Sequence, residues 1–338
     1  MPLIRSIILI LFVVWCGGLY FFVRNRKTRD FFYFYAILGT LLFFVRLVLC
    51  LYSKTFYAET PLEEILQGTA STPYLYRVLV PLLAGLLKAV FSLPDYSSAG
   101  MIWNYLFIMA FFPLFHGYLK KWFDDEPALL VVVLLGFWLP NSFGFNVFED
   151  FLELIIFTAG FWLIREKQDQ YLYPLIFLAA LNKETSLFIV VAYLVSVFRY
   201  QDMTGSILKS LKLFTFLLLP TVLLRLIRGI KPYGCEIFTW PLNLRWLLGG
   251  FWDSSGNLLV FQIFIVFFSL VPFFLLILFF TWKKLDKFLK RNLITVLLYC
   301  SSVLIFAYII EIRVFYPILP ILIPAAFYSL GSKESNTI

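Results

Sequence analysis

The stretch Asn146-Val147-Phe148-Glu149-Asp150-Phe151-Leu152-Glu153-Leu154-Ile155-Ile156-Phe157 opens a long apolar run with three carboxylates. If the segment is helical, Glu149 and Glu153 share a face at i, i+4, and Asp150 lies beside Glu153 at i, i+3. Carboxylates at the edge of hydrocarbon are costly, so a membrane helix that begins with three of them is a candidate functional site. The alternative is an interfacial cap, because acids at a helix N-terminus favour the helix dipole. Such a cap would account for one or two of the three acids.

The composition is typical of a membrane protein with many spans. Of the 338 residues, 62% are hydrophobic and 14% are charged. A membrane helix needs about 20 apolar residues, so the chain is long enough for about ten such helices. We therefore predict an all-α, polytopic transmembrane helix bundle with about 10–12 membrane segments. It forms a single integral membrane domain over residues 1–330, followed by a cytoplasmic tail over residues 331–338.

Short segments rich in Lys and Arg separate the apolar runs, and we call them basic breaks. Their positions determine the predicted orientation. Placing all of them in the cytoplasm satisfies the positive-inside rule. It also explains the net charge of +8 without nucleic-acid binding. The breaks are Arg24–Arg29, Lys120-Lys121, Arg165 with Lys167, residues 199–212 and Lys283–Arg291. The predicted spans lie near residues 3–23, 31–52, 100–119, 127–140, 150–164, 170–182, 184–198, 210–229, 257–282, 292–310 and 314–330.

This layout leaves outer loops at residues 53–99, 141–149 and 230–256. The apolar run 78–93 cannot be a simple span if both of its flanks are outside. We expect it to form an amphipathic helix or a re-entrant hairpin on the outer leaflet; a full span would break one charge rule. Two predicted spans, 127–140 and 170–182, are only about 20 Å long. Their outer ends should therefore lie below the membrane surface and leave a recessed polar cavity.

The scarcity of His and Cys excludes several kinds of chemistry. His116 is the one histidine, at the end of an apolar run, and the four Cys are scattered singly. Neither the spacing of a disulfide framework nor that of a zinc site is present. Ser–His hydrolysis lacks a well-placed imidazole. We therefore predict no metal-ligating residues.

Two oppositely charged pairs interrupt apolar runs on the predicted outer side. Lys183 and Glu184 stand between two spans with no room for a solvated loop, and Glu311 and Arg313 precede the last span. Each pair could be a self-neutralising structural pair, or could line the recessed cavity and bind a substrate. Both interpretations stay open.

Arg225, Arg228 and Lys231 form a basic stripe at i, i+3, i+6 toward the outer end of a span. Long basic side chains near a helix end often extend to lipid headgroups. The alternative is that the stripe binds the phosphate of a lipid substrate. The first outer loop adds the acids Glu59 and Glu63, which are individually weak candidates in a polar loop.

Four short motifs resemble those of the type-C (GT-C) membrane glycosyltransferases. They are Tyr76-Arg77-Val78-Leu79-Val80-Pro81, Phe148-Glu149-Asp150, Leu181-Asn182-Lys183-Glu184-Thr185 and Glu311-Ile312-Arg313-Val314-Phe315-Tyr316-Pro317. The resemblance implies a bundle with a large outer first loop, acidic residues in the first two outer loops and a polyprenyl-phosphate sugar donor. The chain departs from that family in three ways. Its first loop offers glutamates where the family usually has an Asp, an extra span precedes that loop, and there is no soluble C-terminal domain.

From the residues and the resemblance together we expect a glycosyltransferase that works on the outer face of a bacterial cytoplasmic membrane. A carboxylate would take the proton of the acceptor hydroxyl, either Glu149 or Asp150, with Glu59 and Glu63 as rivals. Cations would stabilise the departing lipid phosphate, and the acceptor would be a lipid-linked glycan or a protein. A divalent cation could bridge acids and phosphate, although no spacing demands one. The predicted substrate-binding residues are Arg77, Glu153, Lys183, Glu184, Arg225, Arg228, Lys231, Glu311 and Arg313.

Three other functions compete with this one. A polysaccharide polymerase of the O-antigen type would depend more on outer arginines than on paired acids. A lipid or solute transporter would need charges deeper in the bundle, and Arg46 is the one clear mid-span charge. A non-catalytic assembly subunit would tolerate neutralisation of Glu149 and Asp150.

Overall fold

The computed structural model describes residues 34–35, 37–45, 48, 62–139, 149–198, 200–231, 238–241, 243–244, 270–307 and 312–330. These residues form helices and no β-strand, which confirms the all-α prediction for this part of the chain. Residues 37–45 are helical. The named elements are α3 (Leu62–Gln67), η1 (Tyr74–Tyr76), α4 (Leu79–Phe91), α5 (Tyr96–Leu119), α6 (Asp125–Trp138), α7 (Glu149–Arg165), α8 (Asp169–Asn182), η3 (Glu184–Ser186), α9 (Leu187–Val197), η4 (Tyr200–Asp202), α10 (Met203–Arg228), η5 (Ile277–Thr281), α13 (Lys287–Phe306), η6 (Ile312–Ile318), α14 (Leu319–Phe327) and η7 (Tyr328–Leu330).

Three of the described helices are long and apolar enough to cross a membrane: α5, α10 and α13. At 1.5 Å per residue they are about 30–39 Å long, which matches or exceeds a hydrocarbon core of about 30 Å. These helices support membrane association of the chain. The predicted span 3–23, residues 31–33 and 49–52 of the predicted span 31–52, and the tail 331–338 lie outside the described residues.

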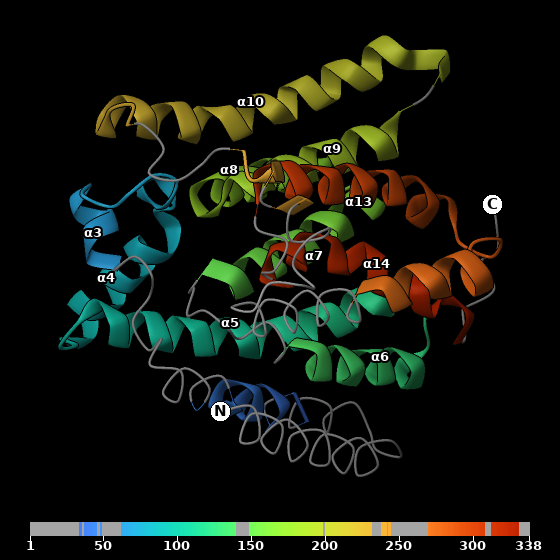
Figure 1. Cartoon of the computed structure of the whole chain (residues 1–338), viewed down its shortest axis with the longest axis horizontal. Helices are drawn as coiled ribbons and strands as arrows, with labels where there is room; N and C mark the ends of the chain where they lie inside the picture. Colours follow the sequence, from blue (N-terminus) through green and yellow to red (C-terminus); the bar gives the residue numbers. More distant parts are fainter. Residues whose placement is uncertain are drawn as a thin grey trace.

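Helix α7 occupies the centre of the bundle. It contacts α5, α8, α9, α14 and η6, and Figure 1 shows it between the layer of α5 and α6 and the layer of α8, α9 and α13. Helix α10 lies on the outside, where it packs against α8 and α9 and leaves many apolar side chains exposed. The segment that opens with three acids is therefore surrounded by other helices.

Three helices begin earlier than predicted because an aspartate caps each of them. The carboxylates of Asp95, Asp202 and Asp286 accept the backbone N–H three residues further on, at N···O distances of 2.6, 3.0 and 2.7 Å. Helices α5, α10 and α13 consequently start at residues 96, 203 and 287, rather than at 100, 210 and 292. A side-chain oxygen at this position satisfies an N–H that has no partner within the helix.

The apolar run 78–93 forms one helix, α4, of 13 residues. Its length of about 20 Å is too short for a full span, and a single helix is not a re-entrant hairpin. One face, with Val80 and Ala84, is buried, while the other exposes Leu82, Leu86 and Val90. Its exposed face is therefore apolar as well, and its location on the outer leaflet stays a prediction.

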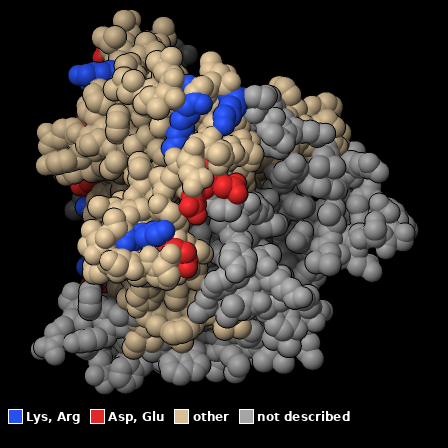
Figure 2. All heavy atoms as spheres, turned by 90° about the vertical axis from the view of Figure 1, so that its left-hand side faces the viewer, with Lys and Arg blue, Asp and Glu red and all other residues tan. Residues whose placement is uncertain are grey.

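Three of the basic breaks that the structure describes, at Lys120-Lys121, Arg165 with Lys167, and Lys283–Arg291, meet at one end of the bundle. Trp122 Nε1 donates to Asp286 Oδ2 at 2.7 Å, and Arg165 Nη1 lies 3.5 Å from the same oxygen. Lys121 pairs with Glu166 at 3.1 Å. We call this the basic end. The opposite end carries α3 and α4, on the left of Figure 1, and Figure 2 looks directly at it.

Candidate functional site at the start of helix α7

The three acids at the start of α7 are buried. The exposed fractions are 4% for Glu149, 3% for Asp150 and 1% for Glu153. An interfacial cap would leave such carboxylates in contact with water. Buried carboxylates need compensating charges and hydrogen bonds, and two of the three have them.

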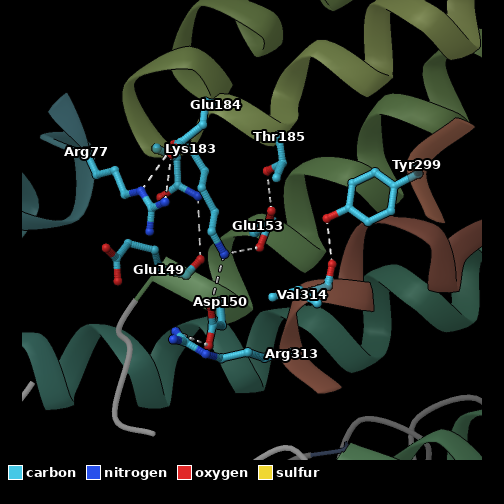
Figure 3. Close-up of polar contacts among 11 residues, drawn as sticks. Arg77, Glu149, Asp150, Glu153, Lys183, Glu184, Thr185, Tyr299, Arg313 and Val314 are labelled. Carbon is cyan, nitrogen blue, oxygen red and sulfur yellow. Dashed lines mark hydrogen bonds and ion pairs between the residues drawn. The ribbon is translucent and has the colours of Figure 1, made fainter. Parts of the chain in front are cut away.

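Lys183 lies between two of these acids. Its ammonium group is 2.7 Å from Glu153 Oε2 and 3.3 Å from Asp150 Oδ1, and the Thr185 hydroxyl donates to the other Glu153 oxygen (Figure 3). Burial by itself would lower the pKa of Lys183, but the charges of Glu153 and Asp150 raise it more, so the pKa lies above its ordinary value. The ammonium group therefore stays charged at neutral pH.

Arg313 approaches the cluster from η6. It is only 6% exposed, and its Nη1 lies 3.7 Å from Asp150 Oδ2. Tyr299 of α13 holds this segment, because its hydroxyl donates to the backbone oxygen of Val314 at 2.5 Å. Arg313 therefore pairs with Asp150, and the interpretation of Glu311 with Arg313 as a structural pair stays open. Glu311 itself lies outside the described residues.

Arg77 and Glu184 form a second ion pair beside the cluster. Arg77 Nη2 lies 2.8 Å from Glu184 Oε1 and Nε lies 3.2 Å from Oε2. Burial would lower the pKa of Arg77, but the Glu184 carboxylate outweighs it and raises that pKa. Lys183 and Glu184 are therefore not a self-neutralising pair, since each binds a partner from another part of the chain.

Glu149 is the acid without a matched cation. Its carboxylate makes no ion pair with any residue that the structure describes, although the Arg77 guanidinium acts on it electrostatically. Figure 3 shows this carboxylate below Arg77 and away from the dashed contacts of Lys183. Within the described residues the cluster holds four carboxylates, from Glu149, Asp150, Glu153 and Glu184, and three cations, from Arg77, Lys183 and Arg313.

A cavity of about 230 Å³ lies next to this cluster, between α8, α9 and α10. We call it the α8–α10 cavity. Its polar wall includes Tyr76, Arg77, Lys183, Glu184 and Arg225. Its apolar wall is formed mainly by Phe214, Leu217, Leu218 and Leu224 of α10. A cavity with one polar and one apolar side therefore lies at the end of α8, and its depth below the membrane surface stays a prediction.

The basic stripe at the end of α10 divides into two groups. Arg225 lines the α8–α10 cavity, with its guanidinium 5.4 Å from the centre of the Tyr76 ring. Arg228 instead donates to the backbone oxygens of Ile65 and, at 2.7 Å, Leu75. Lys231 donates to the backbone oxygen of Gly68 at 2.6 Å. Of the three, only Arg225 lines the cavity. Arg228 and Lys231 instead bind the segment before α4 and hold it against the end of α10.

Of the two first-loop acids that were candidates, Glu63 is not brought to the cluster. Glu63 is exposed on α3, where it accepts a hydrogen bond from Gln67 at 3.2 Å. Glu59 lies outside the described residues. Sequence reasoning missed Thr185, which stands within a motif that had been singled out, and Tyr299, which no local pattern marks.

The described residues contain no group of three or more His, Cys, Asp or Glu arranged to hold a metal ion. Within the cluster, Lys183 and Arg313 already pair with Asp150 and Glu153. No protein-family model, curated protein or solved structure matches this chain.

Proposed function

We propose that the protein is a membrane glycosyltransferase that moves a sugar from a polyprenyl-phosphate carrier to a lipid-linked glycan or a protein. One observation carries the proposal. A buried carboxylate without a matched cation, Glu149, lies next to Arg77 (Figure 3), and Arg77 lines a cavity with a basic wall and an apolar wall. A lipid-linked sugar phosphate requires these three features together.

The two walls of the α8–α10 cavity suit a lipid phosphate. Arg225 and Arg77 offer cations for the phosphate, and the Nη1 atom of Arg77 makes no hydrogen bond within the described residues. The apolar side chains of α10 offer a surface for the isoprenoid chain. Guanidinium groups bind phosphate oxygens with charge-assisted hydrogen bonds.

Glu149 is the candidate general base. In the proposed reaction the acceptor oxygen bonds to the anomeric carbon of the sugar, and the bond from that carbon to the phosphate oxygen breaks. The hydroxyl proton goes to Glu149, and the lipid phosphate leaves with the bonding electrons, next to Arg77 and Arg225. Asp150 is less suited to this role because Lys183 and Arg313 already bind it.

The proposal includes the finer features that the sequence predicts. These are about 10–12 membrane segments in a GT-C-like bundle, a bacterial cytoplasmic membrane, and an active site on its outer face. The shared location of the site residues is supported by Lys183 and Arg313, from two predicted outer segments, which both lie next to Asp150 at the start of α7. Figure 2 shows basic and acidic side chains close together on that face.

The test uses purified protein in lipid nanodiscs with a panel of radiolabelled polyprenyl-phosphate sugars and native lipid extract as acceptor. We expect wild type to release label from the carrier and Glu149→Gln to abolish release. The matched control is Glu64→Gln, which removes an exposed carboxylate of α3 and should retain activity. Asp150→Asn tests whether Asp150, rather than Glu149, is the general base.

The outcomes separate the competing functions. If Asp150→Asn abolishes release and Glu149→Gln keeps it, the base assignment is wrong although the reaction stands. Absence of release with every donor and acceptor would overturn the glycosyltransferase and favour the polymerase or the transporter. If both variants release label as wild type does, neither Glu149 nor Asp150 is the general base.

A further inference from the structure

A second, larger cavity lies at the basic end, with a volume of about 770 Å³. We call it the basic-end cavity. Five cations line it, from Arg165, Lys167, Lys209, Lys287 and Arg291, together with the two carboxylates of Asp169 and Asp202. Ligand sites in proteins commonly occupy about 300–1,000 Å³, so the volume suits a small ligand or a lipid headgroup.

The two arginines of this cavity have structural partners. Arg165 lies 3.5 Å from Asp286 and 4.2 Å from the centre of the Trp122 ring, and it donates to a backbone oxygen. Arg291 donates to the backbone oxygens of Ser196, at 3.0 Å, and Phe198. Both guanidinium groups thus hold neighbouring helices together.

The two aspartates of this cavity also have hydrogen-bond partners within the protein. Asp169 accepts the Tyr193 hydroxyl at 2.7 Å, and Asp202 accepts the backbone N–H of Gly205 at 3.0 Å as the cap of α10. Neither carboxylate forms an ion pair within the described residues. The five cations outnumber these two carboxylates, so the lining of the cavity keeps a net charge of +3.

Lys167, Lys209 and Lys287 come from three different elements: the turn before α8, the first part of α10 and the start of α13. Within the described part of the chain, none of the three ammonium groups makes an ion pair or a hydrogen bond, although all line one cavity. Like charges gathered around one cavity repel one another, and a bound anion would relieve that repulsion.

We propose that the basic-end cavity binds a phosphate-bearing anion, held by Lys167, Lys209 and Lys287. A phosphate group presents several oxygens that three ammonium groups can reach from different sides. The ligand is either the phosphate of an anionic lipid headgroup or a free phosphate. The site is separate from the proposed transferase site at the other end and does not depend on that function.

The test measures binding to purified full-length protein in phosphatidylcholine nanodiscs. One arm adds inorganic pyrophosphate, and the other adds dioctanoyl phosphatidylglycerol. The cavity variant carries Lys167→Gln, Lys209→Gln and Lys287→Gln. The control variant carries Lys283→Gln, Lys284→Gln and Lys290→Gln, which remove the same charge at the same end without lining the cavity.

We expect wild type to bind at least one probe, with the affinity about tenfold or more weaker in the cavity variant. The control variant should change by less than about twofold. Binding of pyrophosphate identifies a free phosphate as the source, and binding of phosphatidylglycerol alone identifies a lipid headgroup. Equal losses in both variants, no loss in the cavity variant, or no binding of either probe to wild type would overturn the proposal. Thermal unfolding without ligand confirms that both variants are folded.

Discussion

Arg77 and Glu184 are 107 residues apart in the sequence, yet their side chains meet at two points, Nη2 to Oε1 at 2.8 Å and Nε to Oε2 at 3.2 Å. The pair joins the segment before α4 to the turn between α8 and α9. Both residues line the α8–α10 cavity, so the pair closes one part of its wall. A guanidinium can make this two-point contact, whereas an ammonium group cannot.

The ion pair between Arg77 and Glu184 should contribute little to the free energy of unfolding but should matter for binding of the lipid donor. The Glu184 side chain is 53% exposed, so a double-mutant cycle of Arg77→Gln and Glu184→Gln should give a coupling of about 1 kcal/mol or less. Arg77→Lys keeps the charge but loses the two-point contact, so the KM for the lipid donor should rise. Denaturant unfolding in detergent and donor titration measure the two quantities. An Arg77→Lys enzyme with unchanged KM would contradict the proposed role.

Removing Lys183 should destabilise the protein strongly. Lys183→Met leaves Asp150 and Glu153 buried without their shared cation, and we expect a loss of about 3–5 kcal/mol. Adding Glu153→Gln should recover part of this loss because one stranded carboxylate disappears. Thermal unfolding measures both effects, with the exposed Lys284→Met as the control. Equal losses for Lys183→Met and Lys284→Met would mean that the network contributes nothing.

Arg225 and Arg228 lie on the same helix, and their substitutions should affect different properties: donor binding for Arg225 and stability for Arg228. Arg225→Gln should weaken donor binding and leave stability unchanged, because Arg225 lines the cavity. Arg228→Gln should lower the free energy of unfolding by about 1–3 kcal/mol, because two backbone oxygens lose a charged donor. The measurements are donor titration and thermal unfolding of each variant. The reverse pattern would show that Arg228 is the residue that binds phosphate.

Membrane orientation can be tested with single cysteines in a chain whose native cysteines are replaced. Gln67→Cys should react with an impermeant maleimide applied to intact cells, and Glu166→Cys and Lys284→Cys should react only after permeabilisation. All three side chains are exposed, so access depends on the membrane. Labelling of Glu166→Cys in intact cells would reverse the orientation and place the α7 cluster on the inner face.

The sequence predicts most helices of the described region but misplaces several of their ends. Apolar runs and basic breaks locate α5 to α10, because burial in hydrocarbon and the positive-inside rule depend on local composition. The start of α10 was missed by seven residues because a polar segment was interpreted as a loop. Polar residues continue a helix when they face outward, and Asp202, the cap, was the better signal.

The partners within the site could not be predicted from one sequence. The acids of α7, Lys183 and Arg313 were correctly singled out as charges within apolar runs. That Lys183 binds Asp150 and Glu153, while Glu184 binds Arg77, depends on which helices become neighbours. Nothing in the spacing of residues 30 to 107 positions apart encodes this.

Helix α10 is one continuous rod of 26 residues that takes part in both cavities. Near its start, Ser206 and Lys209 line the basic-end cavity, and further along, Leu217 and Arg225 line the α8–α10 cavity. Because it packs on only one side of the bundle, a tilt or slide of this rod would change the width of both cavities at once. The two ends of the protein, about 39 Å apart along this helix, are mechanically linked through a single element.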